Sequence, residues 1–162
     1  LPTDDRTPAP REEADERVDD PGPGTLSDVR RSCDATLPKS PIAFEIAKGW
    51  MASKDPVRRS CGYGLVYELA KDKKDKRLTD EFFLGCVEKI GNTIAKEENW
   101  VRVGMGGALM SIGKRNKKLN AAAIKLAKAI GPIHFSDGDK KCEPMNVLKH
   151  LTSDYLRNKL GI

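Results

Sequence analysis

Two clusters of basic side chains in this 162-residue chain have the residue types and spacing of a binding site for an anion. Each cluster follows a predicted helix, and the second comes about one repeat length after the first. The clusters are Lys71, Lys73, Lys74, Lys76 and Arg77, then Lys114, Arg115, Lys117 and Lys118. A row of such cations along one edge suits the phosphate backbone of a nucleic acid. Cations at helix ends also stabilise helix dipoles, so the clusters by themselves leave both roles open.

Two arginines, Arg58 and Arg102, occupy matching places 44 residues apart, each directly after the first apolar valine of a predicted helix. A guanidinium there can hold a phosphate in a concave groove, and it can equally bind a carboxylate of a neighbouring repeat. We favour the structural role. Trp50 and Trp100 are predicted core or interface anchors, although a tryptophan exposed in a basic groove would stack on a base.

No other group of side chains has the spacing of a catalytic or metal site. His134 and His150 lack a Cys or acidic partner at such spacing, and the stretch 137–139 lacks the terminal Glu of a twelve-residue calcium loop. The four cysteines, without CxxC or CxxH spacing, are predicted to be reduced rather than zinc-bound. They are Cys33, Cys61, Cys86 and Cys142. We therefore predict no metal and no cofactor.

The element that must position the second cluster is a predicted helix from Asn99 to Asn116, whose first turn Asn99 can cap. Apolar side chains recur along it at spacings of four, four and three residues. They are Val101, Met105, Leu109 and Ile112. The helix also contains Gly104, Gly106 and Gly107. Each glycine costs roughly 1 kcal/mol relative to alanine inside a helix, so we expect this backbone to pack closely against a neighbouring helix.

That helix has a counterpart at residues 55–71, and the two stretches superpose at an offset of 44 residues. The superposition places Gly62 on Gly106 and Leu65 on Leu109. Such an offset lies within the period of about 40 to 47 residues that is typical of HEAT and armadillo repeats. Two copies favour an α-helical repeat.

The other predicted helices show the same apolar periodicity and recognisable starts. One helix is predicted over residues 41–53, with Ser40-Pro41 at its start, and Asp55-Pro56 starts the counterpart helix. A third helix begins at Thr79, a further one runs over residues 118–130, and the last runs from Pro144 to residue 160. Consecutive helices form antiparallel hairpins, the helix opened by Thr79 pairing with the Asn99 helix. The predicted fold class is all-α, with antiparallel helical hairpins stacked as a short HEAT/armadillo-like solenoid after an irregular Pro-rich N-terminal tail.

The chain divides into a tail, residues 1–38, and a HEAT-like repeat domain, residues 39–162. The first forty residues hold ten acidic against six basic residues, and they have too few apolar side chains to bury a core. The remaining 122 residues hold 23 Lys and Arg against 14 Asp and Glu, a net charge of +9. We expect the tail to lie along a partner, and the basic body suits nucleic acid, anionic lipid or an acidic protein surface.

The chain begins at Leu1 without a Met and shows no cleavable presequence. We therefore expect either a fragment or the processed form of an imported precursor. No apolar run approaches the roughly 20 residues that a membrane span needs. The predicted location is an organelle, a mitochondrion rather than a plastid, and otherwise the cytoplasm.

Residues 39–142 resemble the C-terminal half of the HEAT-like bacterial DNA alkylation repair proteins. The matching stretches are KSPIAFEIAKGW, the DPVRRS helix start, DEFFLGCVEKI, ENWVRVGMGGALMSIGKRNKKLNAAAIKLAKAIGP and the GDKKC loop. The resemblance implies a solenoid that cradles duplex DNA in a basic concave face. It also implies excision of alkylated bases with the help of an Asp and aromatic residues.

The functional positions of that family are where this chain departs from it. The family has a Trp and, four residues later, the catalytic Asp. A gap-free alignment places Leu26 and Arg30 at these two positions. Asp28 lies close to the position of the Asp, but it aligns there only if the alignment is shifted. The second groove Trp falls on Gly107, whereas the groove Arg is retained as Arg58. The N-terminal helices that would complete the cradle are replaced by the acidic tail.

Two hypotheses follow. The first is a non-catalytic HEAT-like scaffold or interaction subunit of a larger organellar complex, which contacts protein subunits through the tail and the exposed solenoid face. Nucleic acid at the basic edge is a further partner that this hypothesis allows. The alternative is a DNA-binding alkylpurine DNA glycosylase that uses Asp28.

Overall fold

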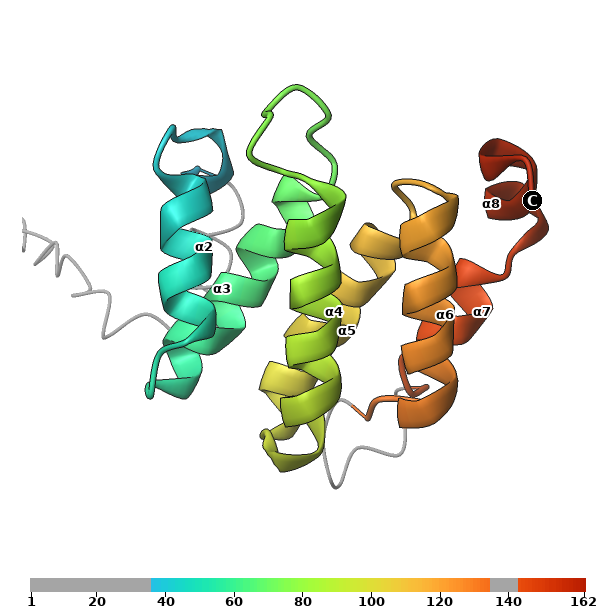
Figure 1. The fold of residues 1–162 in the computed structure, drawn as a ribbon. Helices are drawn as coiled ribbons and strands as arrows, with labels where there is room; N and C mark the ends of the chain where they lie inside the picture. Colours follow the sequence, from blue (N-terminus) through green and yellow to red (C-terminus); the bar gives the residue numbers. More distant parts are fainter. Residues whose placement is uncertain (1–35, 135–142) are drawn as a thin grey trace, which may run out of the picture.

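The computed structural model describes residues 36–134 and 143–162, and these residues form two layers of stacked helices (Figure 1). One layer holds α2 (Ala43–Met51), α4 (Asp80–Thr93) and α6 (Lys117–Ile130); the other holds α3 (Pro56–Leu69), α5 (Asn99–Gly113) and α7 (Val147–Leu151). Helix α8 (Asp154–Leu160) follows, and two short 3-10 helices, η1 (Leu37–Lys39) and η2 (Ile94–Lys96), precede α2 and α5. The predicted all-α class of stacked hairpins is confirmed. Within the described ranges, extended pairing is limited to one bridge between Ile133 and Met145.

Side-chain caps set the starts of several helices, among them α3, α4 and α6. Asp55 Oδ1 accepts a hydrogen bond from the Val57 amide at 2.9 Å, and Thr79 Oγ1 accepts one from the Phe82 amide at 3.2 Å. Asn116 Oδ1 accepts one from the Leu119 amide at 2.9 Å. Each cap satisfies an amide that has no partner inside its own helix. The predicted starts at Asp55 and Thr79 are therefore confirmed.

One predicted helix cap and one predicted helix start were wrong by a residue or two. Asn99 is the first residue of α5 rather than its cap, since Glu98 holds the cap position, and α5 ends at Gly113 rather than Asn116. Helix α2 begins at Ala43 after Ile42, while Ser40 Oγ accepts a hydrogen bond from the Ile42 amide at 3.4 Å. Ser40 thus forms a local turn before the helix.

The single helix predicted from Pro144 to Leu160 is instead two helices, α7 and α8. Met145 cannot be helical, because its backbone exchanges two hydrogen bonds with Ile133 at 2.9 and 2.8 Å. At the break, Thr152 Oγ1 donates to the Leu148 carbonyl and Ser153 Oγ donates to the His150 carbonyl. Hydroxyls that bond nearby carbonyls in this way compete with helix continuation.

The 44-residue repeat appears in space as the register between α3 and α5. A Cβ added to Gly104 would lie 3.3 Å from Ser60 Oγ, and Ser111 Oγ donates to the Tyr67 carbonyl at 2.7 Å; both pairs are 44 residues apart. The expected close approach of the glycine-bearing helix is confirmed. Its main neighbour is α3, and its contact with α4, the predicted hairpin partner, is smaller.

The core contains the two cysteines that the described residues include. Cys61 and Cys86 are 2% and 3% exposed, as their positions on apolar helix faces predict. Burial raises the pKa of the Cys86 thiol to about 12. Burial is also the main cause that raises the pKa of Tyr63 to about 12.

These pKa values predict a loss of stability at high pH. The unfolded chain releases the Cys86 proton near the ordinary pKa of 9.0, whereas the folded chain keeps it to about pH 12. The stabilisation is therefore complete below pH 9 and is lost between pH 9 and 12, at up to about 1.4 kcal/mol per pH unit. Urea unfolding followed by circular dichroism from pH 7 to 10.5 measures this slope. The Cys86→Ala variant should show a shallower decline, and equal slopes would contradict the assignment.

Candidate functional site

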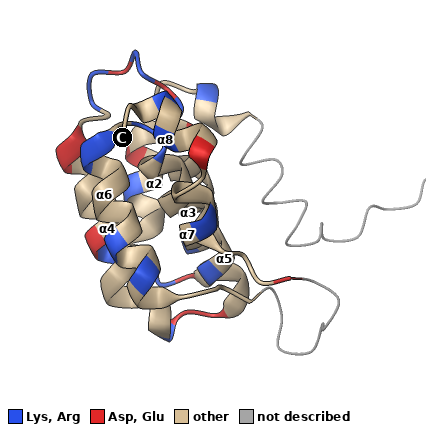
Figure 2. Ribbon diagram, turned by 90° about the vertical axis from the view of Figure 1, so that its right-hand side faces the viewer, with Lys and Arg blue, Asp and Glu red and all other residues tan. Residues whose placement is uncertain are grey.

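Three parts of the chain that are distant in sequence lie along one edge of the solenoid, uppermost in Figure 1: the turn after α3, the turn after α5, and helix α8. In Figure 2, Lys and Arg segments lie at the top of the molecule with acidic segments between them, and further Lys and Arg segments lie on its middle and lower parts. A recess of about 220 Å³ lies there. It is lined by Tyr67, Ala70, Lys71, Lys73, Ser111, Lys114, Arg115 and Lys159. The two basic clusters therefore meet at this edge, as their spacing predicts; we call this site the edge recess.

Three lysines of the edge recess keep their positive charge available. Lys73, Lys114 and Lys159 are exposed, and none of them forms an ion pair with another described residue. Lys71 differs, because its Nζ lies 2.7 Å from Glu68 Oε1 and 4.1 Å from the centroid of the Tyr67 ring. The recess thus presents three uncompensated ammonium groups beside one that is already paired.

Arg115 has a structural role in building the recess. Its Nη1 donates to the carbonyls of Ala70 and Asp72 at 2.7 and 2.6 Å, and its Nη2 donates to the Leu78 carbonyl at 3.3 Å. Its guanidinium carbon lies 4.5 Å from the centroid of the Phe83 ring. Burial lowers the pKa of Arg115, although arginine remains charged at neutral pH. Arg115 therefore holds the turn after α3 against the end of α5.

The other members of the predicted clusters lie outside the recess. Arg77 Nη2 lies 2.6 Å from Asp75 Oδ2 and also donates to the Pro41 carbonyl, and its hydrogen bonds hold the pKa of Asp75 below the ordinary value. Lys118 Nζ lies 3.7 Å from Glu81 Oε1. Lys117 borders a separate groove along α6. Lys74 and Lys76 are exposed on the turn between α3 and α4.

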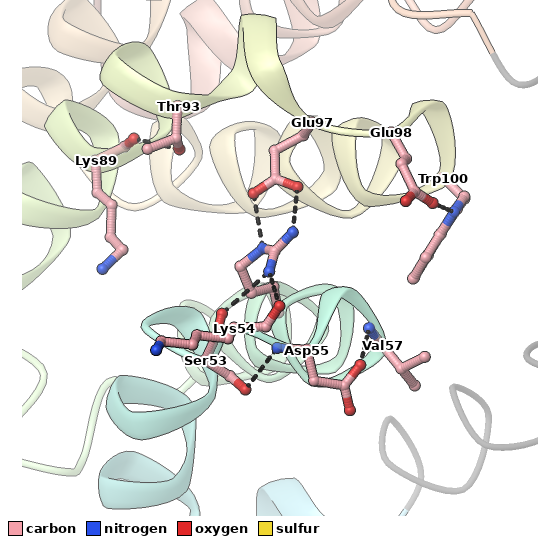
Figure 3. Close-up of polar contacts among 10 residues, drawn as sticks. Ser53, Lys54, Asp55, Val57, Lys89, Thr93, Glu97, Glu98 and Trp100 are labelled. Atoms are coloured by element: carbon pink, nitrogen blue, oxygen red, sulfur yellow. Dashed lines mark hydrogen bonds and ion pairs between the residues drawn. The ribbon is translucent and has the colours of Figure 1, made fainter.

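The predicted link between repeats exists, but it is made by Arg59 rather than by Arg58 or Arg102. Arg59 Nε and Nη2 each lie 2.8 Å from a carboxylate oxygen of Glu97 (Figure 3). Arg58 is exposed, and its Nε lies 3.9 Å from Asp55 Oδ2 at the start of its own helix. Arg102 is half-buried, and its Nε has no hydrogen-bond partner among the described residues. Neighbouring sequence alone gave no sign that Arg59 would face the next repeat.

Lys159 is the residue of the candidate site that the sequence patterns did not point to. It lies on α8, far along the chain from both basic clusters, and only the packing of α8 brings it to the recess. Trp50 and Trp100 are half-buried, and Trp100 Nε1 donates to a Glu98 carboxylate oxygen. His134 and His150 are exposed.

Several predicted features fall outside the residues that the structure describes. They are Leu26, Asp28, Arg30, Cys33, the stretch 137–139 and Cys142. Among the residues it does describe, no three His, Cys, Asp or Glu side chains are grouped so that they could hold a metal ion. In the same residues, no helix has the length and apolar character needed to cross a membrane.

Comparison with known proteins shows the fold. No family model matches this chain, and no curated protein matches it. A solved structure does match, with 23% sequence identity and a TM-score of 0.69, and it is described as "A new family of proteins related to the HEAT-like repeat DNA glycosylases with affinity for branched DNA structures". The match covers 88% of this chain and 66% of the other, just under two thirds of its length. At this identity the likeness shows a shared HEAT-like repeat fold.

Proposed function

We propose that this chain is a non-catalytic HEAT-like repeat module that binds a nucleic acid by its phosphate backbone at the edge recess. The observation that carries the proposal is the convergence of Lys73, Lys114 and Lys159 on one recess from three separate parts of the chain. Ammonium groups gathered without acidic partners repel one another. A bound phosphate would relieve that repulsion and release condensed counterions.

The surroundings of the recess support an anionic ligand of this kind. Lysine acts on a phosphate as a flexible point charge, so three lysines can follow a backbone without reading its sequence. Residues 41–162 carry a net charge of +9, which draws a polyanion toward the domain. The solved structure with the same fold is described as having affinity for branched DNA. Nucleic acid is therefore the class of polyanion that we favour.

The non-catalytic part of the proposal rests on the lining of the recess. None of the described residues that line it is acidic. Excision of a base develops positive charge on the sugar, which a fixed carboxylate would stabilise. The resemblance to the alkylation repair proteins places Leu26 and Arg30 where a Trp and the catalytic Asp would be expected.

Removing the three unpaired lysines is expected to weaken nucleic-acid binding at least about tenfold. In the variant carrying Lys73→Ala, Lys114→Ala and Lys159→Ala, the slope of log K against log salt concentration should fall by up to about three, one for each phosphate that the variant no longer neutralises. Fluorescence anisotropy with a labelled oligonucleotide over a salt series measures both quantities. The weakening should be similar for different base sequences, because phosphate contacts carry no sequence information.

A matched control removes the same charge from the opposite edge. Lys54, Lys96 and Lys128 are exposed near the other ends of the hairpins, so replacing these three by alanine should change binding much less. Equal weakening in both triple variants would show that net charge alone attracts the polyanion, and would count against the recess. Release of 7-methylguanine or 3-methyladenine from alkylated duplex, abolished by Asp28→Asn, would instead support the glycosylase alternative.

The second candidate is a scaffold subunit of a larger protein assembly, in a mitochondrion or another organelle. The observation that favours it is Ile42, which is 56% exposed at the α2 end of the helical stack. An apolar side chain left uncovered at the end of a repeat array is a suitable contact for a partner. Native gel migration from the source cell tests this candidate, because migration as a monomer would argue against it.

A further inference from the structure

Tyr155 on α8 is an aromatic side chain that does not pack into the core of the fold. It is 76% exposed, whereas Tyr63 is buried and Tyr67 lies half-buried against the recess. The other large apolar side chains that the described residues expose are Ile42 and Ile162, both aliphatic. An exposed tyrosine ring contributes little to folding, but it offers an open flat face to a ligand.

The ring stands beside the edge recess. Tyr155 and Lys159 are four residues apart on one helix, a spacing that places both side chains on the same face. Lys159 Nζ lies 6.0 Å from the centroid of the Tyr155 ring, and Lys159 also lines the recess. A separation of 6.0 Å is the outer limit of a cation–π contact. The ring therefore holds the ammonium group only weakly, and this group can turn to a phosphate.

We propose that Tyr155 stacks on an unpaired base whose neighbouring phosphate lies in the edge recess. This inference rests on the proposed function and adds to it the class of nucleic acid that is preferred. Proteins that bind single strands combine a positive groove along the backbone with aromatic rings on which bases stack. In a perfect duplex the bases already stack on each other and cannot reach a side chain at the protein surface. The chain therefore favours strands with unpaired bases over a continuous duplex.

The test compares a labelled single-stranded oligonucleotide with a blunt duplex of the same length, using full-length wild-type protein and Tyr155→Ala. Loss of one stacked base should weaken single-strand binding by about 5- to 150-fold. Duplex binding should change by less than about twofold. Tyr155→Phe and Tyr155→Trp should keep single-strand affinity, since stacking needs the ring and not the hydroxyl. Because Tyr155 is exposed, all three variants are expected to fold, which circular dichroism checks.

The outcomes separate this inference from the function on which it rests. If wild type binds neither oligonucleotide, both proposals are overturned. If wild type binds and the recess lysine variant does not, but Tyr155→Ala binds single strands as wild type does, only the stacking role is overturned. Equal weakening for single strand and duplex in Tyr155→Ala would also overturn it. Asn92→Ala, which removes an exposed side chain at the end of α4 that lies away from the edge recess, serves as the control and should bind as wild type does.

Discussion

Replacing Arg59 by alanine is expected to lower the free energy of unfolding by about 2 to 3 kcal/mol. Arg59 forms a two-point ion pair with Glu97, and its Nη1 also donates to the carbonyls of Ser53 and Lys54 at 3.1 and 2.8 Å (Figure 3). The four hydrogen bonds join the turn between α2 and α3 to the segment that leads into α5. One side chain thus connects two successive repeats.

The large effect follows from the groups that the variant would leave behind. The Glu97 side chain is only 9% exposed and the Arg59 side chain 22% exposed, so water cannot fully replace the missing partner. A carboxylate left in such surroundings without its cation is costly. The hydrogen bond to Glu97 raises the pKa of Arg59, so the guanidinium stays charged at neutral pH.

Arg58→Ala is the matched control, because it removes the same charge one residue earlier. The Arg58 side chain is 64% exposed, and its Nε lies 3.9 Å from Asp55 Oδ2. We expect a change of less than about 0.5 kcal/mol, as for other exposed ion pairs. Urea unfolding followed by circular dichroism measures both variants. Similar destabilisation by Arg58→Ala and Arg59→Ala would mean that charge, rather than this particular pair, stabilises the domain.

Gly62→Ala is expected to destabilise the domain by about 2 kcal/mol. A Cβ added to Gly62 in α3 would lie 2.7 Å from the Met51 amide nitrogen and 3.0 Å from the Trp50 carbonyl carbon. Both atoms belong to the backbone at the end of α2, so relief requires the two helices to separate. Overpacking of this kind typically costs about 1 to 3 kcal/mol, and it outweighs the gain of up to about 1 kcal/mol from replacing a helical glycine.

Gly85→Ala in α4 provides the opposite case. Gly85 is exposed, and nothing lies within 4 Å of a Cβ added there. The same substitution should therefore stabilise the domain by up to about 1 kcal/mol through helix propensity alone. Melting temperatures of the two variants should move in opposite directions. A destabilised Gly85→Ala, or a neutral Gly62→Ala, would contradict the packing described here.

The helices and their repeat were predictable because their causes are local. The starts at Asp55 and Thr79 depend on one side chain and an amide two or three residues away, and the buried faces follow from the helical period. The 44-residue spacing of similar residues predicted a repeat, and the hydrogen bond between Ser111 and Tyr67 spans one such interval. Only the structure shows that α5 packs mainly on α3 rather than on α4, its predicted hairpin partner. The late start of α7 was not predictable, because it depends on the pairing of Met145 with Ile133, which is distant in the chain.

The sequence by itself thus determined an all-α repeat, its main helices and the meeting of two basic clusters at one edge. Only the tertiary structure decided which cations remain available there. It pairs Arg77 with Asp75, commits Arg115 to three backbone carbonyls, and brings Lys159 to the recess. It likewise selects Arg59 rather than Arg58 to join two repeats. The physical reason is that helix formation depends on near neighbours in the chain, whereas the pairing of charged side chains depends on how helices pack against one another.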